Sequence, residues 1–507
     1  MSDSNRKFYL RKLIRMPALP WMLLFGLWCS THFGCSAGPD YVQPELSPPD
    51  AWHASLADGL QSAALSPETL AHWWATLNDP QLSDIIQRAV RGNLDLQTAQ
   101  ARVREARARR GISQAAYFPT VDATGSYAKT HVREAERIGG TEAYELYSAG
   151  LDAGWEIDLF GGVRRSVEAA DADLAATQED LNSVLVSLLA ESALNYVEVR
   201  SLQTRLEVAE ANVQVLEETY QLTQSRFKAG LTDQLAVQGA LYALDGFRSQ
   251  IPILKTNLEA AMNRIAVLLG EYPGALHAEL WLKKPVPVPP KNIAVGVPAE
   301  TLRNRPDVRR AERQLAAQTA RIGVAKADLY PRFSLIGTIG YQSTESDHLF
   351  ESESLGWAYG PNLRWGIFRG GAVLRNIDVQ EARQEQALKQ YRATVLGALE
   401  EAESAMTAYV GEQVRRDALI TATQAAAQAF TLARNQYEAG LVDFSVVLIA
   451  QQSMLSYKDQ LAQSEGTVTT NLVRLYKSLG GGWSVLGSAA LHPDAAKPMG
   501  INENAKK

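Results

Sequence analysis

The sequence contains one unit twice, and this duplication limits the folds open to a chain of 507 residues. The segment FKAGLTDQLAVQ at 227–238 recurs as YEAGLVDFSVVL at 437–448, an offset of 210 residues (437 − 227). Phe118-Pro119 pairs with Tyr330-Pro331 at a similar offset of 212 (330 − 118). Self-similarity at a fixed spacing indicates one structural unit made twice. The Pro-rich stretch 283–298 separates the copies and is typical of a linker.

Each copy opens with a helical stretch, at 82–114 and 299–328, and later contains a very long helical tract. The tract from Val163 to Lys228 holds no proline and predicts a helix of roughly 100 Å at 1.5 Å per residue. The tract 372–438 is similar. A shorter helix follows each tract, after an Ala-Gly-Leu turn whose glycine predicts a left-handed cap. Pro252 predicts a kink in the first of these shorter helices.

Apolar residues recur every seven positions along these helices, which predicts coiled-coil packing. The stripes are Val199, Leu206, Val213, Tyr220 and Phe227; Val237, Leu244, Ile251, Leu258 and Ile265; and Val447, Met454, Leu461, Val468 and Leu475.

Between the helical stretches, apolar and polar residues alternate strictly, which predicts β-strands with one apolar face. The alternating runs are 147–159 and 355–367, and their partner strands are 121–129 and 333–341. The apolar face carries Tyr147, Trp155, Trp357, Tyr359 and Trp365. The hairpin loops are acidic, with Glu134, Glu136 and Glu142 in one copy and Glu345, Asp347, Glu351 and Glu353 in the other.

Strands of about ten residues are long enough to cross a bilayer when tilted. A soluble sheet covered by helices is the alternative, but the heptad stripes indicate that the helices pack on one another. Four strands cannot close a barrel, and open strand edges do not occur in lipid. Closure therefore requires several chains: two would give eight strands and a filled interior, and three would give twelve and a possible channel.

The amino terminus resembles an export signal. Basic residues precede a short apolar core around Trp21–Trp28, and small residues follow it. The chain has two cysteines, Cys29 and Cys35. A mature chain that begins at Cys35 keeps one thiol, which excludes an internal disulfide framework. Gly34-Cys35 fits a lipoprotein cleavage site, although His32 stands where such sites usually carry leucine.

Several functional classes are excluded by what the sequence lacks. The net charge is −6 and the sequence has no basic patch, which argues against nucleic-acid binding. The seven histidines are scattered without metal-ligand spacing, and no hydrolase or nucleotide-binding motif is present. We therefore expect no enzyme activity, no metal and no cofactor.

Several motifs together resemble the TolC superfamily of outer-membrane factors, and specifically its NodT-type efflux lipoproteins. They are GCSAGPDYVQP (34–44), WWATLNDPQL (73–82), NLDLQTAQARVREAR (93–107), RPDVRRAERQLAAQTARIGVAKADLYP (305–331), the two AGL turns and SLGGGW (478–483).

The resemblance implies a membrane α+β fold. This is a homotrimeric 12-stranded β-barrel, with four strands per chain, continuous with a long periplasmic coiled-coil barrel and with two tandem repeats. It implies a passive exit duct for small molecules, joined through a periplasmic adaptor (membrane fusion) protein to an inner-membrane pump of the RND type, and anchored in outer-membrane lipid by palmitate at Cys35.

The expected organisation follows from the repeats and the resemblance. A signal peptide at 1–34 and a lipidated segment at 35–65 come first, and a polar tail at 485–507 comes last. Repeat 1 spans 66–282, with a helix, a β-hairpin at 118–160 and a helical hairpin at 163–270. The linker at 283–298 leads to repeat 2 at 299–484, with a helix, a β-hairpin at 331–368 and a helical hairpin at 372–480.

The resemblance also implies that the turns of the helical hairpins contact the adaptor. These tips are Ala229, Gly230, Leu231 and Thr232, with Ala439, Gly440, Leu441 and Val442. The candidates for a periplasmic gate are Arg434, Tyr437, Asp443 and Asp233. Ile449 stands where relatives often carry aspartate, so the sequence departs here from the pattern that would give a double acidic ring. The two aspartates could instead be ordinary helix N-caps.

Two other functions fit parts of the pattern. A non-conducting periplasmic coiled-coil scaffold would explain the heptads but leave the aromatic strands without a purpose. A duct for secreted proteins would use the same fold. The lipoprotein-like start favours small-molecule efflux, and the sequence does not identify the cargo.

Overall fold

The computed structural model describes residues 36–45, 47–64, 66–131 and 143–483. The expected signal peptide, Cys35, the polar tail and three of the acidic loop residues, Glu134, Glu136 and Glu142, lie outside the described residues. The chain divides into two compact units. The strand unit comprises described residues 36–43, 107–173 and 314–387, and the helical unit comprises the rest.

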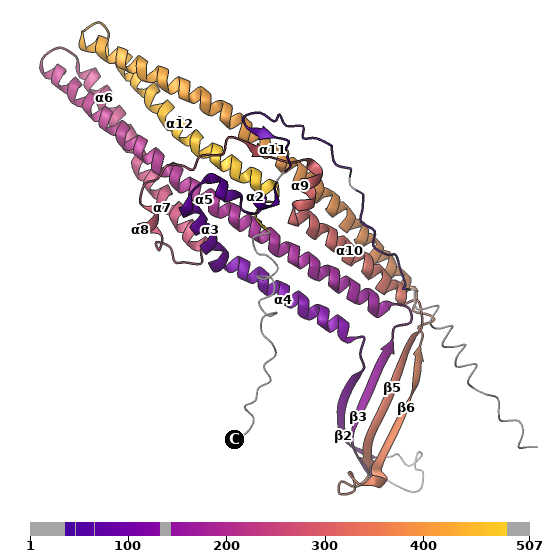
Figure 1. Cartoon of the computed structure of the whole chain (residues 1–507). Helices are drawn as coiled ribbons and strands as arrows, with labels where there is room; N and C mark the ends of the chain where they lie inside the picture. Colours follow the sequence, from indigo (N-terminus) through magenta and orange to yellow (C-terminus); the bar gives the residue numbers. More distant parts are fainter. Residues whose placement is uncertain (1–35, 46, 65, 132–142, 484–507) are drawn as a thin grey trace, which may run out of the picture. The chain divides into compact units, whose positions relative to one another are not determined.

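The strand unit contains one antiparallel sheet with the order β2-β3-β5-β6 (Figure 1). Its strands are β2 (Thr120–His131), β3 (Ala143–Ile157), β5 (Arg332–Ser343) and β6 (Leu355–Arg364), with the short 3₁₀ helix η3 (Ser352–Ser354) before β6. Each copy of the repeat therefore supplies one hairpin. The predicted runs extended to 159 and 367, but β3 and β6 end a few residues earlier.

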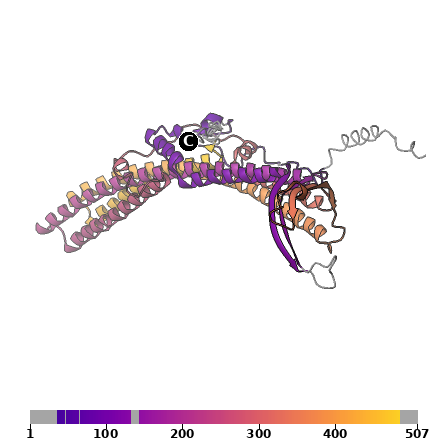
Figure 2. The same cartoon turned by 90° about the horizontal axis from the view of Figure 1, so that it is seen from below.

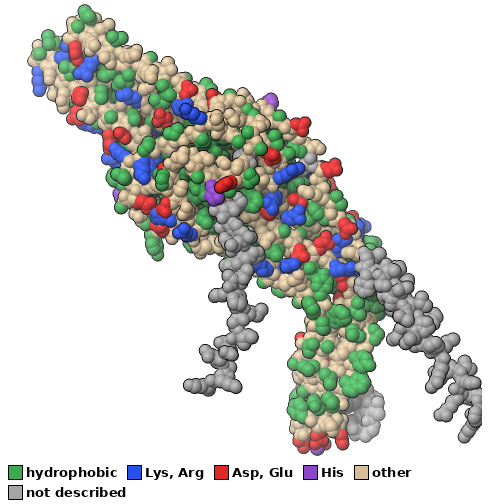
Figure 3. Space-filling view, in the orientation of Figure 1, with side chains coloured by type: hydrophobic (Ala, Val, Ile, Leu, Met, Phe, Trp, Pro, Cys, Tyr) green, Lys and Arg blue, Asp and Glu red, His purple; other side chains and the backbone are tan. Residues whose placement is uncertain are grey.

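The strand register places the apolar residues of all four strands on one face. Tyr127 pairs with Tyr147, Leu335 with Trp155, and Ile339 with both Leu151 and Trp357. Many of these side chains are exposed, including Trp357 at 70% and Tyr359 at 78%. Figure 3 shows hydrophobic side chains gathered over the sheet and acidic ones at its loop end. The opposite face is mostly glycine, serine, threonine and acidic residues.

The two repeats meet in the sheet at the β3–β5 pair. Gly150 lies opposite Gly340 there, on the polar face. A Cβ atom on Gly340 would lie only 2.8 Å from the Cα of Gly150. The pair thus lets the two hairpins approach closely. β2 and β6 are the edges of the sheet.

The helical unit is built around two long hairpins, one from each repeat. The helices are α2 (Pro67–Ala71), α3 (Pro80–Gly92), α4 (Leu94–Ala115), α5 (Gly162–Lys228), α6 (Gln234–Arg248), α7 (Gln250–Leu268), α8 (His277–Leu280), α9 (Pro298–Asn304), α10 (Pro306–Ala327), α11 (Ala372–Glu438) and α12 (Phe444–Ser478), with the 3₁₀ helix η1 (Trp73–Leu77). The outer parts of α4, α5, α10 and α11 belong to the strand unit. Figures 1 and 2 both show the two hairpin turns at the same end of the helical unit.

The seven-residue stripes are largely buried, as coiled-coil packing requires. Leu244, Leu258 and Ile265 are at most 2% exposed, and Val468 and Leu475 are at most 1% exposed. The stripe on α5 weakens toward the turn, where Phe227 is 40% exposed. The stripe prediction was therefore wrong for this last residue.

The two opening helices are each broken, where the sequence predicted one continuous helix. In the first copy the break is Asn93, whose backbone is extended and whose side chain accepts a hydrogen bond from the Leu96 N–H. In the second copy the break is Arg305, which precedes Pro306. A residue before proline is disfavoured in the helical region, so the chain straightens there.

Proline also explains a difference between the returning helices. The first return is divided at Ser249, between α6 and α7, whereas α12 runs unbroken over 35 residues. Pro252 lacks the N–H that would bond the carbonyl of Arg248, and its counterpart 210 residues later is Ala462. The predicted kink is confirmed as a break three residues before the proline.

The Pro-rich stretch between the copies packs on the helical unit. Its β4 (Ile293–Ala294) pairs in parallel with β1 (Leu60–Gln61). Ile293 and Val295 are at most 1% exposed, and the Thr469 hydroxyl donates to the Pro287 carbonyl at 2.8 Å. The segment therefore joins the repeats as an ordered strap. Among the described residues, every helix is too short or too polar to be a membrane-spanning candidate.

Candidate functional site

The turns of the two helical hairpins have the same backbone geometry. Gly230 and Gly440 adopt φ angles of 73° and 75°, in the left-handed region that glycine favours. The Leu231 N–H donates to the Arg226 carbonyl at 2.8 Å, and the Leu441 N–H donates to the Gln436 carbonyl at 2.9 Å. These bonds close each helix in a Schellman-type cap. The two turns are therefore one structural device used twice.

The tip residues predicted to contact an adaptor lie at the surface. Leu231 and Leu441 are 66% and 75% exposed. A Cβ atom on Gly230 or Gly440 would meet nothing within 4 Å. The helical unit therefore presents two exposed leucines, each beside a glycine with open space around it.

The two aspartates that follow the turns differ. The Asp233 side chain accepts a hydrogen bond from the Ala236 N–H at 2.9 Å, so it caps α6. Asp443 occupies the same position before α12, but its side chain makes no capping bond. Both are exposed. Capping accounts for the first carboxylate, whereas the second is exposed and takes no part in a cap.

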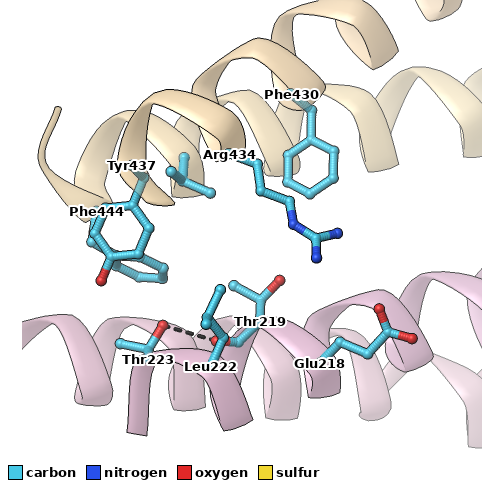
Figure 4. Close-up of a pocket in the computed structure, with 9 residues that line it drawn as sticks. Glu218, Thr219, Leu222, Thr223, Phe430, Arg434, Tyr437 and Phe444 are labelled. Carbon is cyan, nitrogen blue, oxygen red and sulfur yellow. Dashed lines mark hydrogen bonds between the residues drawn. The ribbon is translucent and has the colours of Figure 1, made fainter. Parts of the chain in front are cut away.

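A narrow cavity lies close to the turns, between α5 of the first hairpin and α11 and α12 of the second (Figure 4). Its lining residues are Glu218, Thr219, Leu222, Thr223, Phe430, Arg434, Tyr437, Phe444 and Val447. Two of the predicted gate residues, Arg434 and Tyr437, therefore border the seam between the repeats, whereas Asp233 and Asp443 do not line this cavity.

Tyr437 is packed into this seam. It is 5% exposed, its ring meets Phe444 edge-on at 5.6 Å between centroids, and Arg226 of α5 lies 4.5 Å from its centroid. Its hydroxyl has no hydrogen-bond partner within the described parts of the chain. Arg434 is half exposed and pairs with Glu438 at 3.0 Å. The two gate candidates thus have different surroundings: one is buried and the other is open to solvent.

The sequence did not reveal the polar links that join the hairpins. Arg205 of α5 donates two hydrogen bonds to Asp459 of α12, at 2.9 and 3.0 Å. The Gln451 amide donates to the Thr219 hydroxyl at 3.0 Å. These partners are more than 230 positions apart in the chain, so no spacing rule connects them. By contrast, the ion pair Arg434–Glu438 lies within one helix, and its spacing of four residues is a signal that can be recognised in the sequence.

One group of side chains could in principle ligate a metal, among the residues that the structure describes. Glu345, Asp347 and His348 in the β5–β6 loop bring their ligand atoms within 4.8 Å of one another. All three are exposed, and His348 bonds Glu351 at 2.9 Å. The hydrogen bond to Glu351 and the surrounding carboxylates raise the pKa of His348. An exposed ion-pair network accounts for the group, and we assign no metal to it.

A comparison with models of known protein families identifies the family of the chain, and it matches each of the two repeats separately. The family model described as outer membrane efflux protein matches twice, at residues 85–271 and 297–481. The chain belongs to this family. The predicted resemblance to outer-membrane factors is thereby confirmed, and so are the fold class and the two repeats.

Curated relatives and solved structures of this family cover nearly the whole chain. Nodulation protein T of Rhizobium leguminosarum bv. trifolii is 29% identical over 462 residues, 90% of this chain and 97% of that protein. The solvent efflux pump outer membrane protein SrpC of Pseudomonas putida is 31% identical over 89% of this chain and 96% of its own length. The structure of the outer-membrane channel OprN has a TM-score of 0.83 at 36% identity, covering 89% of this chain and all of that one.

As an outer membrane efflux protein, the chain is an outer-membrane channel that extends into the periplasm. The exposed apolar face of the sheet is the part suited to lipid. The helical unit carries the turns and the seam described above. The family is one of efflux ducts, which supports the expected function and is consistent with the absence of catalytic motifs in the sequence.

Proposed function

We propose that three copies of this chain close a 12-stranded barrel and conduct small molecules passively across the outer membrane, without any catalytic step. The observation that carries the proposal is the four-stranded sheet, with an exposed apolar face and two open edges, β2 and β6. Open edges carry unpaired backbone groups that lipid cannot satisfy. Pairing β6 of one copy with β2 of the next removes every edge, and twelve strands leave an interior wide enough for a channel.

The proposal includes two partners in line with an efflux function. A periplasmic adaptor protein contacts the exposed turns around Gly230 and Gly440, and an inner-membrane pump of the RND type supplies the energy. The support is the exposure of Leu231 and Leu441 and the equal geometry of the two turns. Small molecules are the proposed cargo, because SrpC, of similar length and 31% identical, is named for solvent efflux.

Asp443 is proposed as the acidic residue of a periplasmic gate. Its carboxylate is exposed and makes no capping bond, whereas Asp233 is held by the Ala236 N–H. Three copies would bring three Asp443 carboxylates to one mouth, and such a ring favours cations. Changing Asp443 to Asn should lower cation selectivity, and Asp233→Asn should change it less. Unchanged selectivity in Asp443→Asn would remove this residue from the gate.

Lipid attachment at Cys35 completes the proposal and anchors the chain in the outer membrane. Incorporation of labelled palmitate should occur in the full chain and be lost in Cys35→Ser. Equal incorporation in both proteins would contradict the anchor.

Adjacent residues of β6 offer a matched test of the barrel. Trp357 lies on the apolar face, paired with Ile339, and Ala358 lies on the polar face, paired with Thr338. A lysine on the lipid face costs about 2–4 kcal/mol at mid-membrane and less toward the interfaces. Trp357→Lys should therefore reduce the fraction of three-copy particles seen by native mass spectrometry, and Ala358→Lys should not. Equal assembly of both variants, or a wild type with two copies, would contradict the closed barrel.

A further inference from the structure

The first described residues of the chain, 36–40, lie against the start of α5 and against α10. The Ala37 N–H donates to the Phe160 carbonyl at 2.9 Å, between the end of β3 and the start of α5. Ser36 lies so close to Gly161 that a Cβ atom on this glycine would be 2.9 Å from the Ser36 Cα. The segment is thus in direct contact with the junction between β3 and α5. All these residues belong to the strand unit.

Arg165 holds this segment with most of its donors. Its Nε donates to the Ala37 carbonyl at 3.1 Å, and its Nη2 donates to the Gly38 carbonyl at 3.4 Å and to Asp40 Oδ1 at 2.6 Å. Its Nη1 bonds Glu168 on the same helix at 2.7 Å. The Arg165 side chain is only 5% exposed although Asp40 is 87% exposed. A buried guanidinium is therefore directed at backbone atoms of the segment.

Two glycines allow the segment to come this close. A Cβ atom on Gly323 of α10 would lie 2.6 Å from Arg165 Cγ and 2.7 Å from the Ala37 carbonyl oxygen. Gly38 has a φ of +86°, and its Cβ would lie 2.5 Å from the Gly323 Cα. Since carbon atoms do not approach so closely without a shift of backbone, a side chain at either position would displace the segment.

The equivalent positions in the other copy of the repeat show that these features are not general to the fold. Gly111 precedes Pro119 by eight residues, as Gly323 precedes Pro331, but a Cβ on Gly111 would meet nothing within 4 Å. When the Gly-Gly pairs at 161–162 and 370–371 are aligned, Leu374 replaces Arg165 and is 59% exposed. The arginine and the crowded glycines occur only where the amino-terminal segment lies.

We propose that Arg165, Gly161 and Gly323 form a binding site for residues 36–40 that fixes where the mature chain starts on the strand unit. Cys35 directly precedes Ser36 in the sequence. A lipid on Cys35 then enters the membrane beside the end of β3, at a set position. This last step rests on the proposed acylation, whereas the binding site itself does not.

Hydrogen exchange of the purified full chain in detergent tests the site locally, because the Ala37 amide is one of its bonds. In Arg165→Met and Gly323→Leu, exchange at Ala37 should become about tenfold faster or more, since the segment opens freely. The matched controls are Arg375→Met and Gly111→Leu, which alter an exposed arginine near the start of α11 and the open glycine, and they should exchange as the wild type does. The proposal is overturned if Arg165→Met and Gly323→Leu exchange at the wild-type rate, or if the control variants are accelerated equally.

A variant within the bound segment itself keeps the proposal testable if Arg165→Met and Gly323→Leu fail to fold. Gly38→Ala alters only the bound segment, and it should accelerate exchange at Ala37 while amides of β3 and β5 keep wild-type rates. Slow exchange at Ala37 in this variant overturns the site. Palmitate incorporation is measured in parallel: its absence from the wild type defeats the acylation proposal, whereas the exchange data still decide the binding site.

Discussion

Arg226 of α5 lies over the ring of Tyr437 of α11, with its guanidinium carbon 4.5 Å from the ring centroid. Its Nη1 also donates to the Glu438 carbonyl at 3.4 Å. The contact joins the first hairpin to the second, close to the turn of each hairpin. Together with Arg205–Asp459 and Thr219–Gln451, it makes the seam between the repeats a series of polar links as well as an apolar stripe.

The ring of Tyr437, rather than its hydroxyl, should hold this part of the seam. Tyr437→Phe keeps the contacts with Arg226 and Phe444 and removes a buried hydroxyl that has no hydrogen-bond partner among the described residues, so stability should change by less than about 0.5 kcal/mol. Tyr437→Ala removes the ring and should cost about 3 kcal/mol. Thermal unfolding followed by helical circular dichroism measures both. A large loss in the phenylalanine variant would show that the hydroxyl is bonded in the assembled protein.

The turns should tolerate a small residue better than a charged one. Gly230→Asn and Gly440→Asn place a side chain in the left-handed region at a cost of about 1 kcal/mol, and asparagine is the residue that best tolerates it. Gly230→Glu and Gly440→Glu add bulk and charge at the exposed tip. Efflux in intact cells should be abolished by glutamate and largely kept with asparagine, while all four variants assemble. Normal export by the glutamate variants would rule out adaptor contact there.

The close pair Gly150–Gly340 should be essential to the junction between the hairpins of the sheet. Gly340→Ala places a Cβ atom 2.8 Å from the Gly150 Cα and 2.9 Å from the Ala149 carbonyl oxygen, which forces β3 and β5 apart. We expect a loss of about 1–3 kcal/mol, seen as a lower temperature of oligomer dissociation. Gly360→Ala is the control, because a Cβ there meets nothing within 4 Å. The idea fails if the two variants dissociate at the same temperature.

Arg305 should make the helical unit acid-sensitive. Burial raises the pKa of Asp307, but the hydrogen bond and charge of Arg305 outweigh it and hold the pKa below its ordinary value. A lowered pKa contributes stability above the unfolded value, near 3.9, and this contribution is lost as pH falls through the folded value. Asp307→Asn should lose about 1.5–3 kcal/mol at neutral pH.

The same variant should also show a weaker fall in stability between about pH 5 and pH 2 than the wild type. The exposed Asp84, changed to Asn, controls for the loss of a surface carboxylate. Parallel pH profiles for Asp307→Asn and the wild type would contradict the role of this carboxylate.

Much of the fold could be predicted from the sequence because its signals are local and periodic. The alternation of Leu151 and Trp155 with polar residues gives a strand face, and the seven-residue spacing of Leu244 and Leu258 gives a buried stripe. The two glycine turns repeat a cap whose chemistry is local. Helix breaks were missed at Asn93 and Arg305, where a side-chain cap and a following proline outweigh helix propensity.

The contacts within the site could not be read in this way. Arg226 meets Tyr437, and Arg205 meets Asp459, only because two hairpins that are more than 200 residues apart in sequence pack side by side. The binding site of Arg165 had no signal either, since Gly111 and Gly323 look alike in sequence. They differ only in whether another segment lies against them.

Conduction through the assembled barrel is the central claim, and single-channel recording of the purified protein in planar lipid bilayers tests it most directly. The account predicts discrete, ohmic current steps from particles of three copies, and less frequent steps from Trp357→Lys, which should complete fewer barrels. Particles of three copies that insert in the bilayer and carry no current would contradict it.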